Sequence, residues 1–72
     1  MYKKIFFTIA LPLPSSYTKA LAEDEAPAVA DRFGADAWNV TSAKGGWELE
    51  LYYDRETDAA QASEDILLAL VN

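Results

Sequence analysis

The sequence predicts a small α+β domain, ferredoxin-like in plan, with the element order βαββα. Three observations predict it: an alternating apolar segment near the N-terminus, two β-rich runs joined by glycines in the middle, and a helical Ala/Leu pattern at the end. A chain of 72 residues is long enough for one small domain and no more. We therefore expect residues 1–72 to form a single domain around one core.

The central hairpin is the strongest of these signals. Its arms are Ala37–Ala43 and Trp47–Asp54, and Lys44-Gly45-Gly46 connects them. Both arms are rich in β-branched and aromatic residues, and a glycine pair between two such runs is typical of a β-hairpin. Because side chains alternate along a strand, we expect one set of the second arm to face the helices. That set is Trp47, Leu49, Leu51 and Tyr53, with Trp38 and Val40 from the first arm.

The N-terminal segment has two interpretations. In the first it is a strand, in which Ile5, Phe7, Ile9 and Leu11 face the core and Pro12 and Pro14 end the pairing. In the second it is a signal peptide with basic Lys3-Lys4, apolar Ile5–Leu13 and a small-residue cleavage site at Ala20-Leu21-Ala22. Cleavage there would release an exported acidic peptide. We favour the strand, because the prolines interrupt the apolar run, which is also too short to span a bilayer.

Two helices complete the predicted order. Ser15 or Ser16 would cap a helix over Tyr17–Glu25, with Tyr17 and Leu21 inward. Pro27 would kink this helix or start a second short turn that carries Val29 and Phe33, and Gly34 would end it. In the last helix, Asp58 and Gln61 resemble a capping box. Its expected inward positions are Ala59, Ala62, Ile66 and Leu70.

The order matches most of a split β-α-β unit. A right-handed crossover would place the first strand beside the third and parallel to it, giving the strand order 1-3-2 with both helices on one face. A complete ferredoxin-like sheet has a fourth strand that pairs with the first. Without it, the first strand would be an apolar edge that invites pairing with another chain. Either the domain dimerises there, or a tail covers the edge, or the sequence is a piece of a longer protein. Our second hypothesis is therefore a structural domain that forms a homodimer through its first strand.

Charge and composition limit the classes of function that we expect of this chain. The net charge is −6, and all twelve acidic residues lie from Glu23 onward. An acidic surface repels the phosphate groups of nucleic acids, so we expect neither a nucleic acid nor a membrane as partner. Such a surface favours a basic protein, although acids also simply keep small domains in solution. The chain has neither Cys nor His and no glycine-rich phosphate loop, so we expect no catalysis, no cofactor and no metal. Asp54, Glu56 and Asp58 have Ca²⁺-loop spacing but lack the required Gly and Glu at the later positions.

One surface remains as a candidate site. The sheet face opposite the helices should combine aromatic rings, acids and short polar groups, which is a composition suited to docking a protein. The alternative is that these side chains only steady the sheet through cross-strand pairs. Our candidate partner-binding residues are Phe6, Thr8, Glu48, Glu50 and Tyr52, with Asn39 and Thr41 beside them.

The second hairpin arm carries a family resemblance. Trp47-Glu48-Leu49-Glu50-Leu51-Tyr52-Tyr53-Asp54, followed by the acidic turn Arg55–Asp58, resembles the N-terminal domain of PrmA, the bacterial ribosomal protein L-eleven methyltransferase. In that family a Pro is usual where Thr57 stands. The resemblance implies a cytoplasmic substrate-recognition module that presents a basic ribosomal protein to a separate domain binding S-adenosylmethionine. The residues of that second domain are not in this chain, so the resemblance implies a non-catalytic module.

Overall fold

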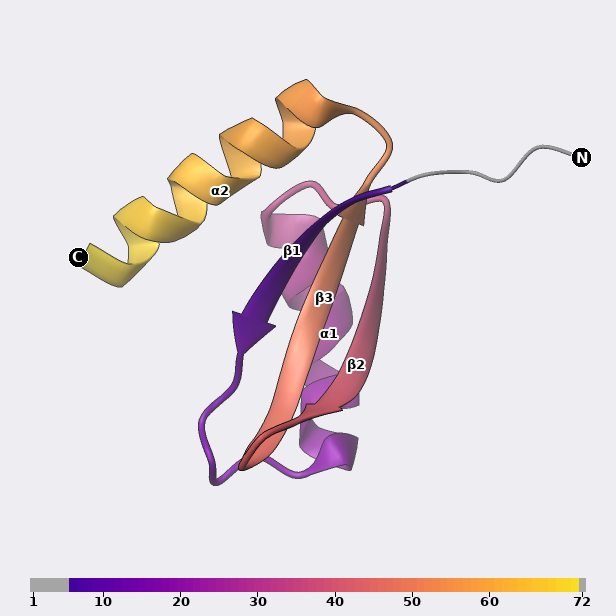
Figure 1. The fold of residues 1–72 in the computed structure, drawn as a ribbon, viewed down its shortest axis with the longest axis vertical. Helices are drawn as coiled ribbons and strands as arrows, with labels where there is room; N and C mark the ends of the chain where they lie inside the picture. Colours follow the sequence, from indigo (N-terminus) through magenta and orange to yellow (C-terminus); the bar gives the residue numbers. More distant parts are fainter. Residues whose placement is uncertain (1–5, 72) are drawn as a thin grey trace, which may run out of the picture.

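The computed structural model describes residues 6–71 and confirms the order βαββα (Figure 1). The strands are β1 (Phe7–Pro12), β2 (Ala37–Ala43) and β3 (Gly46–Tyr53). The helices are α1 (Lys19–Arg32) and α2 (Glu56–Val71). The strand interpretation of the N-terminal segment is therefore confirmed for Phe7–Pro12, whereas Ile5 lies outside the described residues.

The three strands form one sheet in the predicted order β1-β3-β2. The predicted direction of β1 was wrong, because β1 pairs with β3 antiparallel rather than parallel. The reason is topological. The crossover through α1 makes β1 parallel to β2, and the hairpin then reverses the chain, so β3 enters between them antiparallel to both.

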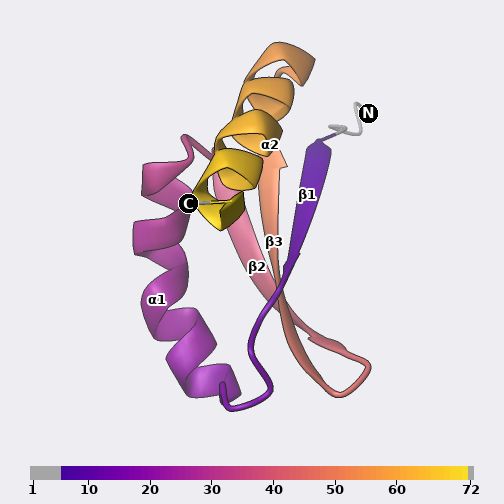
Figure 2. The same ribbon diagram turned by 90° about the vertical axis from the view of Figure 1, so that its left-hand side faces the viewer.

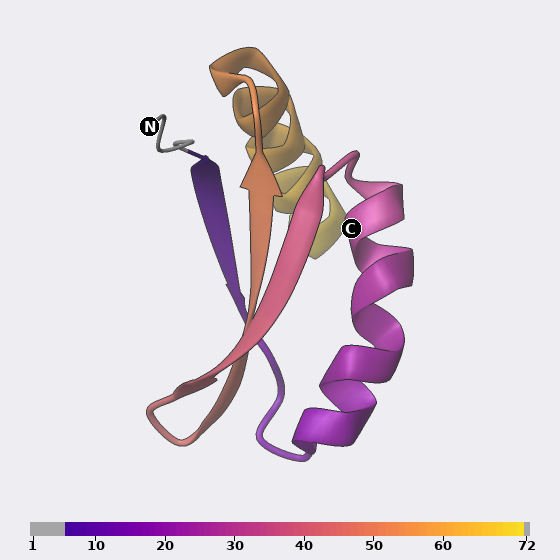
Figure 3. The same ribbon diagram turned by 90° about the vertical axis from the view of Figure 1, so that its right-hand side faces the viewer.

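Both helices cover the same face of the sheet, as predicted (Figures 2 and 3). The helix α1 packs on β2 and β3, and α2 packs on β1 and β3. Figure 1 shows that α2 lies at an angle to α1 and diverges from it. No helix among the described residues covers the other face of the sheet, which we call the open face.

The core lies between the sheet and the two helices. Leu49 is 2% exposed, and Leu51 and Tyr53 are fully buried, so the predicted inward set of β3 is confirmed, with Trp47 half-buried at its end. The buried side chains of α1 are all alanines, which lets this helix lie close to the sheet. The buried helix residues are Ala22, Ala26 and Ala30 in α1 and Ala62 and Ile66 in α2.

Helix α1 differs from its prediction. It is one continuous helix with Pro27 inside it, so the predicted end at Glu25 and the alternative of a separate second turn were wrong. Its cap is Thr18, whose side chain accepts a hydrogen bond from the Leu21 N–H at 3.1 Å, so neither Ser15 nor Ser16 caps it. Pro27 is exposed, and the buried stripe of alanines holds the helix on the sheet on both sides of it. Leu21 is 41% exposed rather than inward.

The ends of the elements are partly as predicted. Gly34 ends α1 with φ +65°, and the N–H groups of Gly34 and Ala35 bond back to the carbonyls of Asp31 and Ala30, as in a Schellman motif. The predicted capping box of α2 was wrong. The helix begins at Glu56, before Asp58, and the Gln61 amide bonds forward to Asp65.

Two further expectations concern sheet positions. The hairpin turn consists of Lys44 and Gly45, with Gly45 at φ +84°, and Gly46 already belongs to β3. Phe7 was expected inward, yet it is 40% exposed at the start of β1, which is an edge strand with a neighbour on one side only among the described strands. The side chain of Leu70 lies outside the described residues.

Candidate functional site

The register of the sheet places the predicted site residues on the open face. Three cross-strand rows span it, each centred on a residue of β3. Side chains of directly paired residues lie on the same face, so all three rows point away from the helices. The rows are Thr8–Tyr52–Ala37, Ala10–Glu50–Asn39 and Pro12–Glu48–Thr41.

An aromatic pair and a carboxylate meet at one end of the open face. The rings of Phe6 and Tyr52 are tilted at 52° with their centroids 5.6 Å apart, a favourable geometry for aromatic pairs. The Tyr52 hydroxyl donates a hydrogen bond to Glu50 Oε1 at 3.0 Å. The structure thus brings Phe6, Tyr52 and Glu50 into one cluster, whereas Glu48 stands one row beyond Glu50.

The protonation of Tyr52 reflects this environment. Desolvation by its neighbours is the main cause that raises the pKa of Tyr52 above 10.0, followed by the hydrogen bond to Glu50 and the negative charge of that carboxylate. The contact with Asn39 acts in the opposite direction. Tyr52 therefore stays a neutral donor near neutral pH and keeps the Glu50 carboxylate in place.

The charged side chains in the three rows of the open face are all negative. Glu48 and Glu50 are the charged residues of its three rows, and none of the row residues is basic. Both carboxylates are half-buried and stand two residues apart on β3, about 7 Å by the rise of a strand. Carboxylates beside aromatic rings suit the binding of Lys or Arg side chains, through charge-assisted hydrogen bonds and cation–π contacts.

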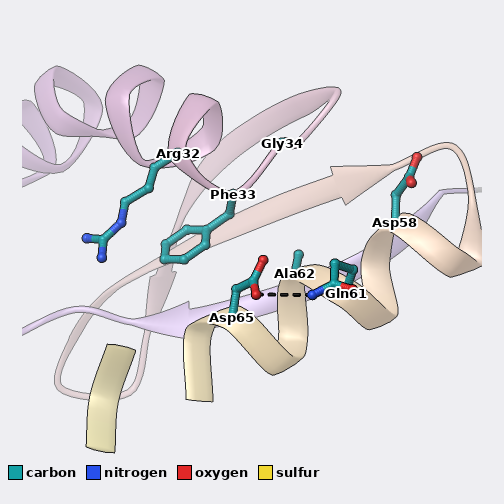
Figure 4. Close-up of a pocket in the computed structure, with 7 residues that line it drawn as sticks. All are labelled: Arg32, Phe33, Gly34, Asp58, Gln61, Ala62 and Asp65. Atoms are coloured by element: carbon teal, nitrogen blue, oxygen red, sulfur yellow. Dashed lines mark hydrogen bonds between the residues drawn. The ribbon is translucent and has the colours of Figure 1, made fainter. Parts of the chain in front are cut away.

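A polar pocket lies on the helix side, between the end of α1 and the first half of α2 (Figure 4). Its volume is about 270 Å³. Figure 4 shows Asp65 and Gln61 turned toward each other and joined by a hydrogen bond of 3.1 Å. The Arg32 guanidinium lies 5.1 Å from the centre of the Phe33 ring. The lining residues are Arg32, Phe33, Gly34, Asp58, Gln61, Ala62 and Asp65.

A second hollow lies where the two helices diverge, and no pattern in the sequence predicted it. Its volume is about 340 Å³, and its walls include the core residues Leu49 and Ile66. No polar side chain lines this apolar groove, so it lacks the groups that orient a small ligand in most binding sites. Its lining residues are Leu11, Pro12, Leu13, Val29, Phe33, Leu49, Ile66 and Ala69.

Two other kinds of site are absent from the described residues. In the range 6–71, no group of three or more acidic side chains is arranged to hold a metal ion. Neither described helix has the length and apolar character that crossing a bilayer would need.

Comparisons of the chain with family models, with curated proteins and with solved structures returned no match. The resemblance to the PrmA N-terminal domain therefore stays a prediction that depends on the residues of β3.

Proposed function

We propose that this chain is a non-catalytic protein-binding module whose open face recognises a basic segment of its partner. The observation that carries the proposal is the composition of that face. It is a sheet surface that no described helix covers, with a Phe6–Tyr52 ring pair next to two carboxylates and no basic residue in its rows. An uncovered face with aromatic and charged groups is a typical protein contact surface.

The spacing of the carboxylates suggests the form of the partner segment. Glu48 and Glu50 project from alternate residues of β3, which matches the side-chain spacing of an extended peptide with basic residues at alternate positions. The PrmA resemblance supplies the class of partner. We propose a basic ribosomal protein in the bacterial cytoplasm, bound without a cofactor.

Charge reversal on the open face tests the proposal. The immobilised chain is offered a mixture of bacterial ribosomal proteins at low salt, and one or more basic proteins should be retained. Glu48→Lys should lower the affinity about tenfold or more, because a ΔΔG of about 1.4 kcal/mol is typical of losing one close charge pair. Retention should also weaken as salt is added, since screening acts on such pairs.

The matched control is Glu64→Lys. Glu64 is exposed on α2, away from the open face, and its replacement changes the net charge by the same amount. Equal losses for Glu48→Lys and Glu64→Lys would show that only the overall charge matters, and the proposal would be wrong. No retention of any basic ribosomal protein would also refute it.

A second variant probes the aromatic part of the face. Phe6 is 38% exposed, so Phe6→Ala should leave the fold intact. Aromatic side chains often dominate binding energy, and we expect a loss of affinity comparable to that of Glu48→Lys. Unchanged affinity would remove Phe6 from the proposed contact.

A further inference from the structure

The outer edge of β1 offers backbone groups for pairing. In the described part of the chain β1 pairs with β3 on one side only. The Leu13 N–H donates to the Trp47 carbonyl at 3.1 Å, in the same register as the strand pairs. Because donors alternate in antiparallel ladders, the backbone groups of Phe7, Ile9 and Leu11 point toward β3, and those of Thr8 and Ala10 point outward.

Pro12 limits the length of this edge. It occupies the next outward position, where its missing N–H removes a donor, as expected for proline on an edge strand. The free edge of β1 within the strand therefore presents two N–H donors, from Thr8 and Ala10, each with its own carbonyl acceptor.

The residues of this edge strand are uncharged, and the carboxylates paired with them in the sheet, such as that of Glu50, belong to β3 on the inner side of β1. No charged residue occurs from Phe6 to Thr18, although the chain carries a net charge of −6. Phe7 in β1 is 40% exposed, and Leu67 and Leu68 in α2, the helix that packs on β1, are 61% and 57% exposed. Edge strands are usually guarded by charges or by a covering element, and β1 has no charged residue to serve as that guard.

The opposite edge of the sheet differs. By the same alternation of the ladder with β3, the backbone N–H and C=O groups that point away from the sheet in β2 belong to Trp38, Val40 and Ser42. None of the large exposed apolar side chains of the described residues belongs to β2. Two of these side chains, Phe6 and Phe7, lie in or beside β1, while Leu67 and Leu68 lie on α2 and Leu21 lies on α1.

We propose that a second copy of this chain pairs with the free edge of β1 in antiparallel fashion, about a two-fold axis at Ile9. In this register Thr8 of each copy lies opposite Ala10 of the other. Both outward N–H groups of each copy then meet a carbonyl of the other copy. Self-pairing suits this edge because its register is self-complementary and no like charges meet at the seam.

The dimer would have a continuous six-stranded sheet with all four helices on one side. Opposed residues of an antiparallel pair share a face, so Ile9 meets its own copy on the helix side and the α2 helices of the two copies become neighbours. The two open faces would join into one. The dimer does not depend on the proposed function of that face.

Disulfide cross-linking tests the register. The chain has no native Cys, so the two exposed positions Thr8 and Ala10 can each be replaced without background reaction. In the proposed register, residue 8 of one copy and residue 10 of the other have Cα atoms about 5.5 Å apart, which a disulfide can bridge. Like residues lie about 8–9 Å apart across the axis, beyond the limit of about 7 Å.

The experiment mixes Thr8→Cys with Ala10→Cys under mild oxidation and weighs the products by mass spectrometry. The expected result is a large excess of the mixed disulfide, about tenfold over either homodimer. Random collision would instead give the statistical ratio of about two mixed dimers to one of each homodimer. That ratio, or the absence of cross-linked product, would overturn the proposal.

Sedimentation of matched proline variants tests the edge itself. Ala10→Pro removes an outward donor of β1, and Ser42→Pro makes the same change on the β2 edge. We expect dimerisation of the native chain and of Ser42→Pro, and a monomer for Ala10→Pro. A monomeric native chain at millimolar concentration, or equal behaviour of both variants, would refute the inference.

Salt separates this inference from the proposed function. Self-association of an acidic chain through an uncharged edge should persist or strengthen as salt screens the mutual repulsion. Binding of a basic partner to Glu48 and Glu50 should weaken under the same conditions. Failure of one therefore leaves the other intact.

Discussion

Removing the Tyr53 hydroxyl should destabilise the fold by a predictable amount. Tyr53 ends β3, its side chain is fully buried, and its hydroxyl donates a 2.8 Å hydrogen bond to the carbonyl of Phe33, where α1 ends. Tyr53→Phe keeps the ring and deletes this single link between sheet and helix. A typical net loss for such a bond is about 0.5–1.5 kcal/mol, and we expect about 1 kcal/mol, because Phe33 borders the polar pocket, where water can reach.

Thermal unfolding followed by circular dichroism measures this loss. For a domain of this size, 1 kcal/mol corresponds to a fall in Tm of about 4–8 °C. The control is Tyr52→Phe, which removes the neighbouring hydroxyl from the half-exposed hydrogen bond to Glu50 and should change stability by less than about 0.5 kcal/mol. Equal effects of the two variants would refute the assignment of a structural role to Tyr53.

The same variant carries a pH signature. Burial, followed by the negative charges of Asp36, Asp58 and Asp65, raises the pKa of Tyr53 above 10.0 in the folded protein. Below pH 10 the ring is neutral in both states, so its stabilising contribution is complete. Above that pH the unfolded chain binds fewer protons than the folded one, and stability falls until the pH passes the folded pKa.

Chemical denaturation at a series of alkaline pH values checks this signature. The advantage of the native chain over Tyr53→Phe should therefore shrink as the pH rises above about 10. Tyr17 and Tyr52 also have raised pKa values, but both residues are unchanged in Tyr53→Phe, so the difference between this variant and the native chain reports Tyr53 alone. A difference that stays constant or grows with pH would contradict the reasoning.

Three further substitutions test the packing and the helix. Leu51→Ala opens a cavity at a fully buried site and should cost about 2–5 kcal/mol, which urea denaturation measures; a loss below about 1 kcal/mol would contradict the assigned core. Thr18→Ala removes the side chain that accepts the Leu21 N–H, and should lower the free energy of unfolding by about 1 kcal/mol in the same assay. Pro27→Ala should raise the free energy of unfolding by about 1–3 kcal/mol, since the substitution restores a helix-compatible residue at an exposed interior position. A destabilised variant would show instead that the rigidity of the proline stabilises α1.

The sequence alone determined those features of the fold that depend on local chemistry. The alternation in Trp47–Tyr53 identifies β3 and its buried face, because side chains of a strand point to opposite sides whatever lies beyond it. Gly34 marks the end of α1, because glycine adopts the left-handed backbone conformation without the steric cost that other residues have. The same alternation placed Glu48, Glu50 and Tyr52 on the open face together.

Other features depend on contacts between distant segments, and only the tertiary structure decided them. Pro27 reads locally as a helix break, yet α1 continues because its alanine stripe packs on the sheet over its whole length. The direction of β1 relative to β3 follows from where the crossover and the hairpin place β3 between its neighbours. The angle between the helices depends on how two separate helices pack on one sheet, which no local pattern encodes. This angle leaves the apolar groove between the helices, and Leu67 of α2 stays exposed.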